Sequence, residues 1–392
     1  MPPRLYVDAH ATTPCDPQVV AAMLPFFADT FGNAASQQHA YGWEAHAAVE
    51  TARQHVAQAV GARVRDVVFT SGATKANNLA LLGGTEAVRS ASPQAPPPHL
   101  VTVVTEHPAV LDPCTWLESK GVRITRVPVQ PDGLVDLDVM AQAITPGTTL
   151  VSVMAANNEI GVLQPVQAVA GLAHAAGALM HSDASQAIGT VAIDMAALGL
   201  DLLSCTAHKL YGPKGIGALV VRRSAKVPLS PQQHGGGHER GLRSGTLNVP
   251  GIVGFGEECR LATARRADDA MRLAGLRDRL WNRLQEAVPG LHRRGAATPR
   301  LPHNLNVGVD GLSGRDLVLA LTDIAVSPGA ACASTSAEPS HVLLALGLTE
   351  AEARGSLRFG LLRTITAVEI DDLANRVIAA VTALRAQRAA LR

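Results

Sequence analysis

Two lysines and a histidine lie close together in a glycine-rich stretch, SCTAHKLYGPKGIG, at residues 204–217. An uncharged lysine amine can attack a carbonyl group to form a Schiff base, and burial near a positive charge lowers its pKa enough for that role. Lys209 follows an apolar run that predicts a strand, whereas Lys214 lies among glycine and proline in the next turn. Position therefore favours Lys209 as the reactive lysine, with Lys214 structural or a supporting charge; an ordinary basic turn on a surface loop is the alternative.

Cys332 is the most informative of the five cysteines in the chain. It lies in SPGAACASTSAEPS (327–340), whose small and polar residues are typical of an exposed, mobile loop. A free thiol in such a loop favours a nucleophile over a packing group. The other four cysteines (15, 114, 205 and 259) are expected to pack as small hydrophobic side chains.

Further polar groups follow predicted strands. SGAT at 71–74 is typical of an anion site, because small residues expose backbone N–H groups and Thr74 adds a hydroxyl; a simple helix cap is the alternative. Asp183 suits either a helix cap or the partner of a buried protonated nitrogen such as a pyridinium. His107 is either structural or a ring that stacks on a flat ligand.

HGGGHERGLRSGT, at 234–246, contains the HGGG sequence found in the oxyanion loop of esterases. No serine of the chain lies in G-x-S-x-G, so hydrolase chemistry is unsupported. The stretch instead predicts a flexible loop whose Arg240, Arg243 and Thr246 suit phosphate or subunit contacts. The chain also lacks a P-loop and a dinucleotide-binding glycine pattern.

The elements that must position these groups alternate between strand and helix. Ala-rich segments at 75–91 and 165–177 predict helices, and the apolar runs between them favour an α/β domain with a buried, mostly parallel sheet. Because ligands bind at the carboxyl ends of such strands, the polar segments after them are expected to converge on one site. The predicted strands cover residues 64–70, 100–105, 122–129, 149–156, 178–183, 201–206 and 216–223.

Composition narrows the class of protein. Of the 392 residues, 47% are hydrophobic and 17% charged, which indicates a compact globular protein. The 34 basic and 33 acidic residues leave no charge surplus for nucleic acid or membrane, and 3% aromatic content argues against base stacking. No apolar run reaches the roughly 20 residues that span a bilayer, and the N-terminus is not a signal peptide. Without CxxC spacing we expect no metal site or disulfide framework, and a cytoplasmic protein.

The chain changes character after Gly251, where a long helix interrupted at most once is predicted. SASPQAPPP (90–98) is an earlier surface connector. A second α/β unit follows the long helix, with a strand at 303–309 and a final helix at about 367–391. We expect a large ligand-binding domain at 16–260, and a small domain formed by 1–15 and 261–392 that carries the Cys332 loop.

Taken together, these stretches resemble the cysteine desulfurases of the class V aminotransferase group, in their housekeeping iron–sulfur form. The resemblance runs almost end to end, and matching motifs in register are far more specific than any single one. It rests on DAHATTP (8–14), FGNAAS (31–36), FTSGAT (69–74), TEHPAVLD (105–112), NNEIGV (157–162), HSDASQ (181–186), AHKLYGPKGIGAL (207–219), HGGGHERGLRSGT (234–246) and the Cys332 loop.

The resemblance implies a fold type I enzyme that uses pyridoxal 5'-phosphate and works as a homodimer. Lys209, Cys332 and His107 would be catalytic, with Lys209 bound to the cofactor and Cys332 attacking the substrate sulfur. Substrate L-cysteine would be bound by Asn33, Asn158 and Arg358. The residues expected to bind the cofactor, with Thr246 reaching it from the other subunit, are Ala73, Thr74, His107, Asn158, Asp183, Gln186, Thr206, His208, Lys209 and Thr246.

The implied reaction releases L-alanine and leaves a persulfide on Cys332 for an acceptor, in iron–sulfur cluster assembly or thiolation. A selenocysteine lyase or related class V lyase is the rival enzyme, and a sulfur-relay scaffold with weak activity of its own is a rival of another class. The chain departs from the usual motifs at Lys75, at Thr206-Ala207 and at Pro328.

Overall fold

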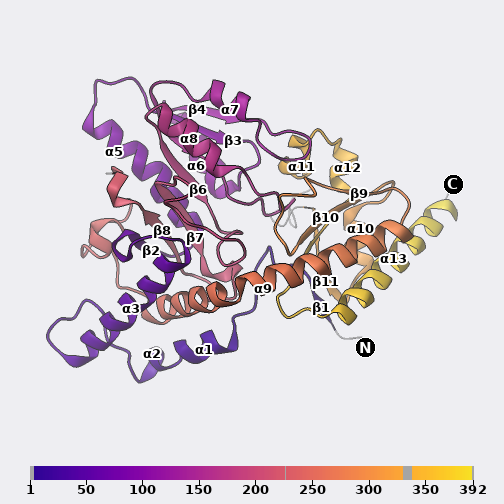
Figure 1. Ribbon diagram of the computed structural model, residues 1–392, viewed down its shortest axis with the longest axis horizontal. Helices are drawn as coiled ribbons and strands as arrows, with labels where there is room; N and C mark the ends of the chain where they lie inside the picture. The colour runs from indigo at the N-terminus through magenta and orange to yellow at the C-terminus, as the bar shows by residue number, and fades with distance from the viewer. Residues whose placement is uncertain (1–3, 226, 330–337, 391–392) are drawn as a thin grey trace.

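The computed structural model describes residues 4–225, 227–329 and 338–390 of the chain. A seven-stranded sheet forms the centre of its larger unit, on the left in Figure 1. Strand β8 runs antiparallel to both of its neighbours and every other adjacent pair is parallel, so the predicted mostly parallel sheet is confirmed. From edge to edge the strands are β2 (Val67–Thr70), β8 (Gly217–Val221), β7 (Leu202–Thr206), β6 (Leu179–Asp183), β5 (Thr148–Ser152), β3 (His99–Val103) and β4 (Arg123–Val127).

Both faces of this sheet are buried, each in its own hydrophobic cluster. Successive residues of a strand point to opposite sides, so each strand contributes to both clusters. Val67 and Phe69 of β2 enter one hydrophobic cluster, whereas Val68 enters another. The first face packs against α3 (Ala40–Ala59), α7 (Leu137–Ala143), α8 (Val166–Ala175) and part of α9 (Val249–Ala287). The second face packs against α4 (Ala73–Asn78), the π-helix η2 (Leu79–Gly83) and α6 (Pro108–Ser119). The predicted helix at 75–91 is thus formed by α4, η2 and α5 (Gly84–Ala91) in succession.

Helix α9 is a single helix of 39 residues, in agreement with the long helix predicted after Gly251. The side chain of Asn248 accepts a hydrogen bond from the backbone N–H of Gly251, which caps its first turn. Its first half packs on the central sheet through Ile252 and Phe255, and its second half enters a separate cluster through Leu280 and Leu284. Helices α1 (Pro17–Met23) and α2 (Pro25–Ala28) contact α9 from outside the sheet.

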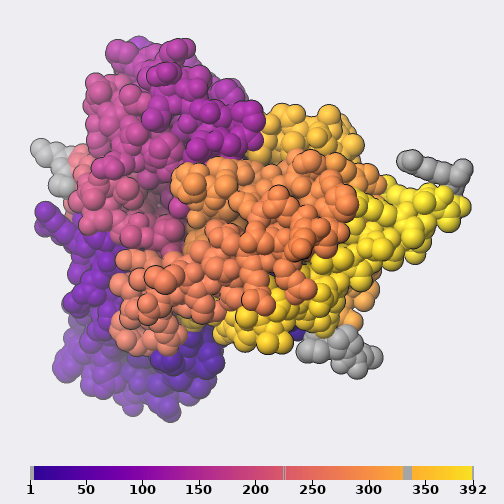
Figure 2. Space-filling model, turned by 45° about the vertical axis from the view of Figure 1, so that its right-hand side comes forward, coloured from indigo at the N-terminus to yellow at the C-terminus, as the bar shows by residue number. Residues whose placement is uncertain are grey.

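The smaller unit is built on an antiparallel four-stranded sheet. Its strands, in order, are β12 (Ser327–Pro328), β13 (Ser356–Gly360), β10 (Asn304–Val309) and β9 (Leu291–Arg293). A short parallel pair joins β1 (Leu5–Tyr6) to β11 (Ile324–Ala325). Helix α13 (Ala367–Ala390) lies along α9, as Figure 2 shows in yellow against orange. The remaining helices are α10 (Gly314–Ala320), α11 (His341–Ala345) and α12 (Glu350–Arg354).

The two units have their own hydrophobic clusters, one containing Phe255 and the other Leu5, Val7 and Leu280. We propose that they are the large domain, 16–260, and the small domain, 1–15 with 261–392. Two observations support this division. The two halves of α9 pack in different hydrophobic clusters, and the N-terminal strand β1 pairs with β11 of the smaller unit. Within the described ranges, none of the helices combines the length and the apolar character needed to cross a bilayer.

Candidate active site

One cavity of about 620 Å³ brings together polar residues that follow five of the strands of the central sheet. They reach it from the carboxyl ends of β2, β3, β5, β6 and β7, where open α/β sheets bind their ligands. A cavity of this size suits a cofactor together with a small substrate. Its lining consists of His10, Ala11, Thr12, Ser71, Gly72, Ala73, Thr74, Lys75, His107, Ala109, Met154, Ala156, Asn158, Asp183, Ser185, Gln186, Thr206, His208, Lys209, Lys214 and Gly215.

Asp183 is a buried carboxylate at the end of β6. Its Oδ1 accepts hydrogen bonds from the backbone N–H and the hydroxyl of Ser185, at 2.9 and 2.5 Å. Its Oδ2 accepts a hydrogen bond from the side-chain amide of Asn77, at 2.7 Å. The carboxylate therefore caps the following turn and also faces the cavity, so both functions considered from the sequence are compatible with one geometry.

His107 likewise combines two contacts. Its Nδ1 accepts a hydrogen bond from the backbone N–H of Ala109 at 3.0 Å and so caps α6, with Pro108 in the first turn. The ring also lines the cavity. Burial lowers the pKa of His107, and the negative charge of Asp183 acts in the opposite direction. The ring is therefore neutral at pH 7 and, because Nδ1 accepts the Ala109 N–H, carries its proton on Nε2.

Small and hydroxylated residues gather at the end of the cavity near the start of α4. Thr74, Thr206 and His208 all line it there. The turn before α4 packs closely against Gly217 of β8. A Cβ at position 217 would lie 2.8 Å from the Cα of Gly72, so position 217 requires glycine. Burial lowers the pKa of His208 to about 4, and Lys209 and Lys214 act in the same direction.

Lys209 ends a 3₁₀ turn (Ala207–Lys209) that directly follows β7. Its Nζ donates a hydrogen bond to the backbone carbonyl of His10 and another, at 2.7 Å, to that of Ala11. Both acceptors belong to the N-terminal segment, which crosses the edge of the cavity after β1. The lysine predicted to be reactive therefore lies in the cavity, whereas Lys214 is exposed at its rim.

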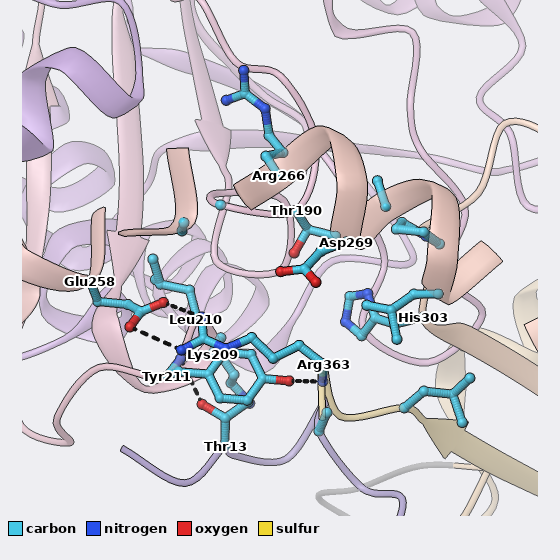
Figure 3. A pocket seen from close by; sticks show the side chains of 17 residues that line it. Thr13, Thr190, Lys209, Leu210, Tyr211, Glu258, Arg266, Asp269, His303 and Arg363 are labelled. Atoms are coloured by element: carbon cyan, nitrogen blue, oxygen red, sulfur yellow. Dashed lines mark hydrogen bonds and ion pairs between the residues drawn. The ribbon is translucent and has the colours of Figure 1, made fainter. Parts of the chain in front are cut away.

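Lys209 also lines a second, smaller cavity of about 40 Å³ (Figure 3). Tyr211 adopts a φ of 70° beside it, and the Thr13 hydroxyl accepts a hydrogen bond from the Tyr211 backbone N–H at 2.8 Å. The guanidinium of Arg363 lies 4.0 Å from the centre of the Tyr211 ring. It also pairs with Asp16 and, at 2.6 Å, with Glu258 of α9. This network joins the Lys209 turn to the N-terminal segment, to α9 and to the segment that follows β13.

We expect replacement of Arg363 with alanine to lower the free energy of unfolding by about 3–5 kcal/mol, because Glu258 and Asp16 would lose a buried cationic partner. Burial raises the pKa of Glu258 to about 7, so an unpaired carboxylate there is costly. Urea denaturation of the wild type and the variant measures this difference in the free energy of unfolding. The matched control is Arg260→Ala on the same helix, whose exposed pair with Glu257 should contribute less than about 1 kcal/mol. Equal losses in the two variants would contradict the buried network.

Three of the sequence-predicted residues that the structure describes do not line the larger cavity. Asn33 and Thr246 are exposed, and Asn33 accepts a hydrogen bond from the backbone N–H of Ala35. Arg358 is fully buried, with Nη1 donating to the carbonyl of Asn158 at 3.1 Å and Nη2 pairing with Asp8 at 2.7 Å. Cys332 and the centre of its predicted loop lie outside the described residues.

No function is predicted for His10 from the sequence, although the residue lies in the DAHATTP segment. In the structure it lines the cavity and contacts both Gln186 and Lys209. The local signal was a histidine placed shortly after a predicted N-terminal strand. The sequence alone does not reveal the partners of this histidine, because Gln186 and Asn304, which form hydrogen bonds with the ring, are far along the chain.

Comparison with known proteins identifies the family. Residues 5–373 match the family model described as "Aminotransferase class-V", and the chain belongs to that family. Within it the chain belongs with the cysteine desulfurases. It is 48% identical over 381 residues to "Cysteine desulfurase IscS" of Anaeromyxobacter sp. (strain Fw109-5), covering 97% of this chain and 93% of the relative.

Solved structures agree with this placement. A chain described as "NIFS-LIKE PROTEIN" is similar with a TM-score of 0.88 and 34% identity, covering 97% of this chain and 99% of that one. A second structure, "SspA in complex with cysteine", is similar with a TM-score of 0.79 and 34% identity, covering 91% of this chain and 98% of that one. The α/β fold with a mostly parallel central sheet is therefore the fold of this family.

Proposed function

We infer that this protein is a cysteine desulfurase, which takes sulfur from L-cysteine and releases L-alanine. The observation that carries this conclusion is the single cavity that brings together the Lys209 amine, the Asp183 carboxylate and the His107 ring. An amine, a carboxylate and a neutral imidazole are the groups required to attach a carbonyl cofactor, neutralise its ring and move protons. The relatives that share the whole length of the chain have this activity in their names.

We propose that the cofactor is pyridoxal 5'-phosphate, and the residues present fit its chemical groups. Thr74, Thr206 and His208 would hold the phosphate at the end of the cavity near α4, aided by the backbone at Ala73. Asp183 would pair with the ring nitrogen and Gln186 would contact the ring oxygen. When bound, this cofactor accepts electrons from the carbon next to the substrate amino group.

The protein's own groups then bind the substrate and move its protons. Lys209 would hold the cofactor covalently and, once free, its amine would remove the α-proton of the substrate. Asn158 would orient the substrate, and Arg358 beside it carries a buried positive charge suited to a carboxylate. The Nε of Arg358 has no hydrogen-bond partner among the described residues, which leaves a donor available on that guanidinium.

We propose that Cys332 receives the sulfur. Its thiolate would attack the sulfur of the substrate, so that an S–S bond forms as the substrate C–S bond breaks, and the carbon then takes a proton to leave as alanine. The resulting persulfide would pass to an acceptor protein in iron–sulfur cluster assembly or thiolation. The four described cysteines are free thiols, which supports a cytoplasmic location.

A homodimer is proposed on the basis of an exposed apolar surface on α1, α2 and the start of α3. Clustered large apolar side chains on the surface are typical of protein–protein contacts. Thr246 is also exposed, as a residue reaching the partner's cofactor would be in a single chain. The exposed apolar side chains are Val20, Leu24, Phe27, Phe31, Tyr41 and Trp43.

The proposed function is tested by incubating the purified protein with pyridoxal phosphate, L-cysteine and a reductant. We expect a visible absorbance band from bound cofactor, and alanine and sulfide formed in equal amounts. L-Selenocysteine is the comparison substrate, and it separates a desulfurase from a selenocysteine lyase. A protein that binds the cofactor but turns over only selenocysteine would contradict the assignment.

Replacing His107 with alanine is expected to lower turnover by about 100- to 10,000-fold, the usual contribution of a general acid or base. Because burial lowers the pKa of this ring below 6.5, it is neutral at pH 7 and becomes protonated only as the pH falls through that lowered value. Wild-type turnover should therefore decline below pH 6.5, and the variant should lose that limb of its pH–rate profile. His39→Ala is the matched control, because His39 also caps a helix through Nδ1 but lies outside the cavity lining. A His107 variant with an unchanged acid limb would contradict the assignment.

A further inference from the structure

His10 is a buried histidine with both ring nitrogens in hydrogen bonds. Its Nδ1 lies 2.9 Å from the side-chain oxygen of Gln186, and its Nε2 lies 3.0 Å from the side-chain nitrogen of Asn304. The ring stacks on that of His303, with 4.6 Å between their centres. The residue thus lies between the small domain, which supplies Asn304 and His303, and the cavity, which Gln186 lines.

The neighbouring contacts fix where the His10 proton lies. The Asn304 amide nitrogen also donates to the backbone carbonyl of Glu159, at 3.2 Å, and a carbonyl can only accept. The group facing Nε2 of His10 is therefore a donor, so Nε2 is the acceptor. A neutral ring then carries its proton on Nδ1 and donates it to the Gln186 oxygen.

The same reasoning fixes the Gln186 amide. Its Nε2 donates to the backbone carbonyl of His10 at 3.1 Å, which places the amide oxygen against Nδ1 of the ring. One N–H of this amide remains for a ligand in the cavity. The carbonyl of His10 also accepts a hydrogen bond from Lys209, so one residue contacts both the predicted cofactor lysine and the predicted ring-oxygen ligand.

We propose that His10 is a positioning residue that holds Gln186 as a hydrogen-bond donor toward the ring oxygen of pyridoxal phosphate. The proposal rests on the proposed function. A fixed donor stabilises the ring oxygen in its negatively charged form and so lowers the pH at which the bound cofactor loses its proton. The titratable and charged groups that face His10 are His303, Arg358 and Lys209, and with burial they lower the pKa of His10 and keep the ring neutral.

The test compares His10→Leu, which removes the ring donor, with His10→Asn, whose amide can still donate to Gln186. The readouts are the pH midpoint of the cofactor's visible absorbance and the dissociation constant for pyridoxal phosphate. We expect His10→Leu to move the midpoint to higher pH and to weaken cofactor binding about tenfold, the loss typical of one hydrogen bond. His10→Asn should lie closer to the wild type in both. A His10→Leu protein with unchanged midpoint and affinity would overturn the proposal.

A double-variant comparison separates positioning from general damage. If His10 acts through Gln186, adding His10→Leu to a Gln186→Ala protein should leave the midpoint where Gln186→Ala alone puts it. Independent, additive shifts would overturn the proposal while the proposed function stands. A wild-type protein without a visible cofactor band would overturn both.

Discussion

Replacing Lys209 with alanine is expected to stop alanine formation from L-cysteine almost completely, with a loss of about 1,000-fold or more. Two functions depend on this amine, namely covalent attachment of the cofactor and removal of the substrate proton. Its Nζ lies in the cavity with the carbonyls of His10 and Ala11, at the end of a strand that fixes its position. Borohydride reduction followed by mass spectrometry should show cofactor attached to Lys209 in the wild type and none in the variant.

Lys214 provides the matched control, because it belongs to the same glycine-rich stretch and also lines the cavity. Its side chain is exposed, and it lies in the turn before β8 rather than after β7. Lys214→Ala should therefore keep the covalent cofactor and lose less than about tenfold in turnover, as expected for a surface charge. Attachment of the cofactor to Lys214 instead of Lys209 would contradict the assignment of the two lysines.

Replacing Cys332 with alanine is the second large change, expected to lower desulfuration by about 100-fold or more because no other cysteine is suited to replace it. Burial raises the pKa of Cys114 and Cys205 to about 12 and that of Cys259 well above its usual value. Those thiols stay protonated at neutral pH. The variant should still bind the cofactor, because the residues proposed to hold it, such as Asp183 and Lys209, line the described cavity.

Cys15 is the matched control for this change, since it is partly buried and also a free thiol. Burial and the charge of Glu258 raise its pKa, so it is a weak nucleophile. Cys15→Ala should desulfurate at the wild-type rate within about twofold, as expected for a substitution away from the reacting groups. If this variant lost activity and Cys332→Ala kept it, the sulfur would pass through Cys15.

The parts of the site that sequence predicted are those that follow strands. Lys209, Asp183 and His107 each come directly after an apolar run, and the rule for open α/β sheets places such positions together. The same local patterning located the strands and the long helix. The antiparallel direction of β8 was not predictable, because an apolar run buried on both faces has the same composition in either direction.

The contacts that sequence could not predict are those between distant segments. His10 acquires its significance from Gln186 and Asn304, 176 and 294 residues away. Arg363 likewise pairs with both Asp16 and Glu258, which lie 347 and 105 residues away along the chain. Neither set of contacts is marked in the sequence by a periodic pattern or a short spacing. Only the folded chain therefore reveals which polar groups are buried together.

The most direct test of the account is mass spectrometry of the protein, loaded with pyridoxal phosphate, after brief incubation with L-cysteine and no reductant. We expect one added sulfur atom on the peptide that contains Cys332. Reductant should remove it, and it should be absent from Cys332→Ala and Lys209→Ala. Alanine formed at the wild-type rate by Cys332→Ala, or a sulfur adduct confined to another cysteine, would contradict the claim that this enzyme transfers sulfur through Cys332.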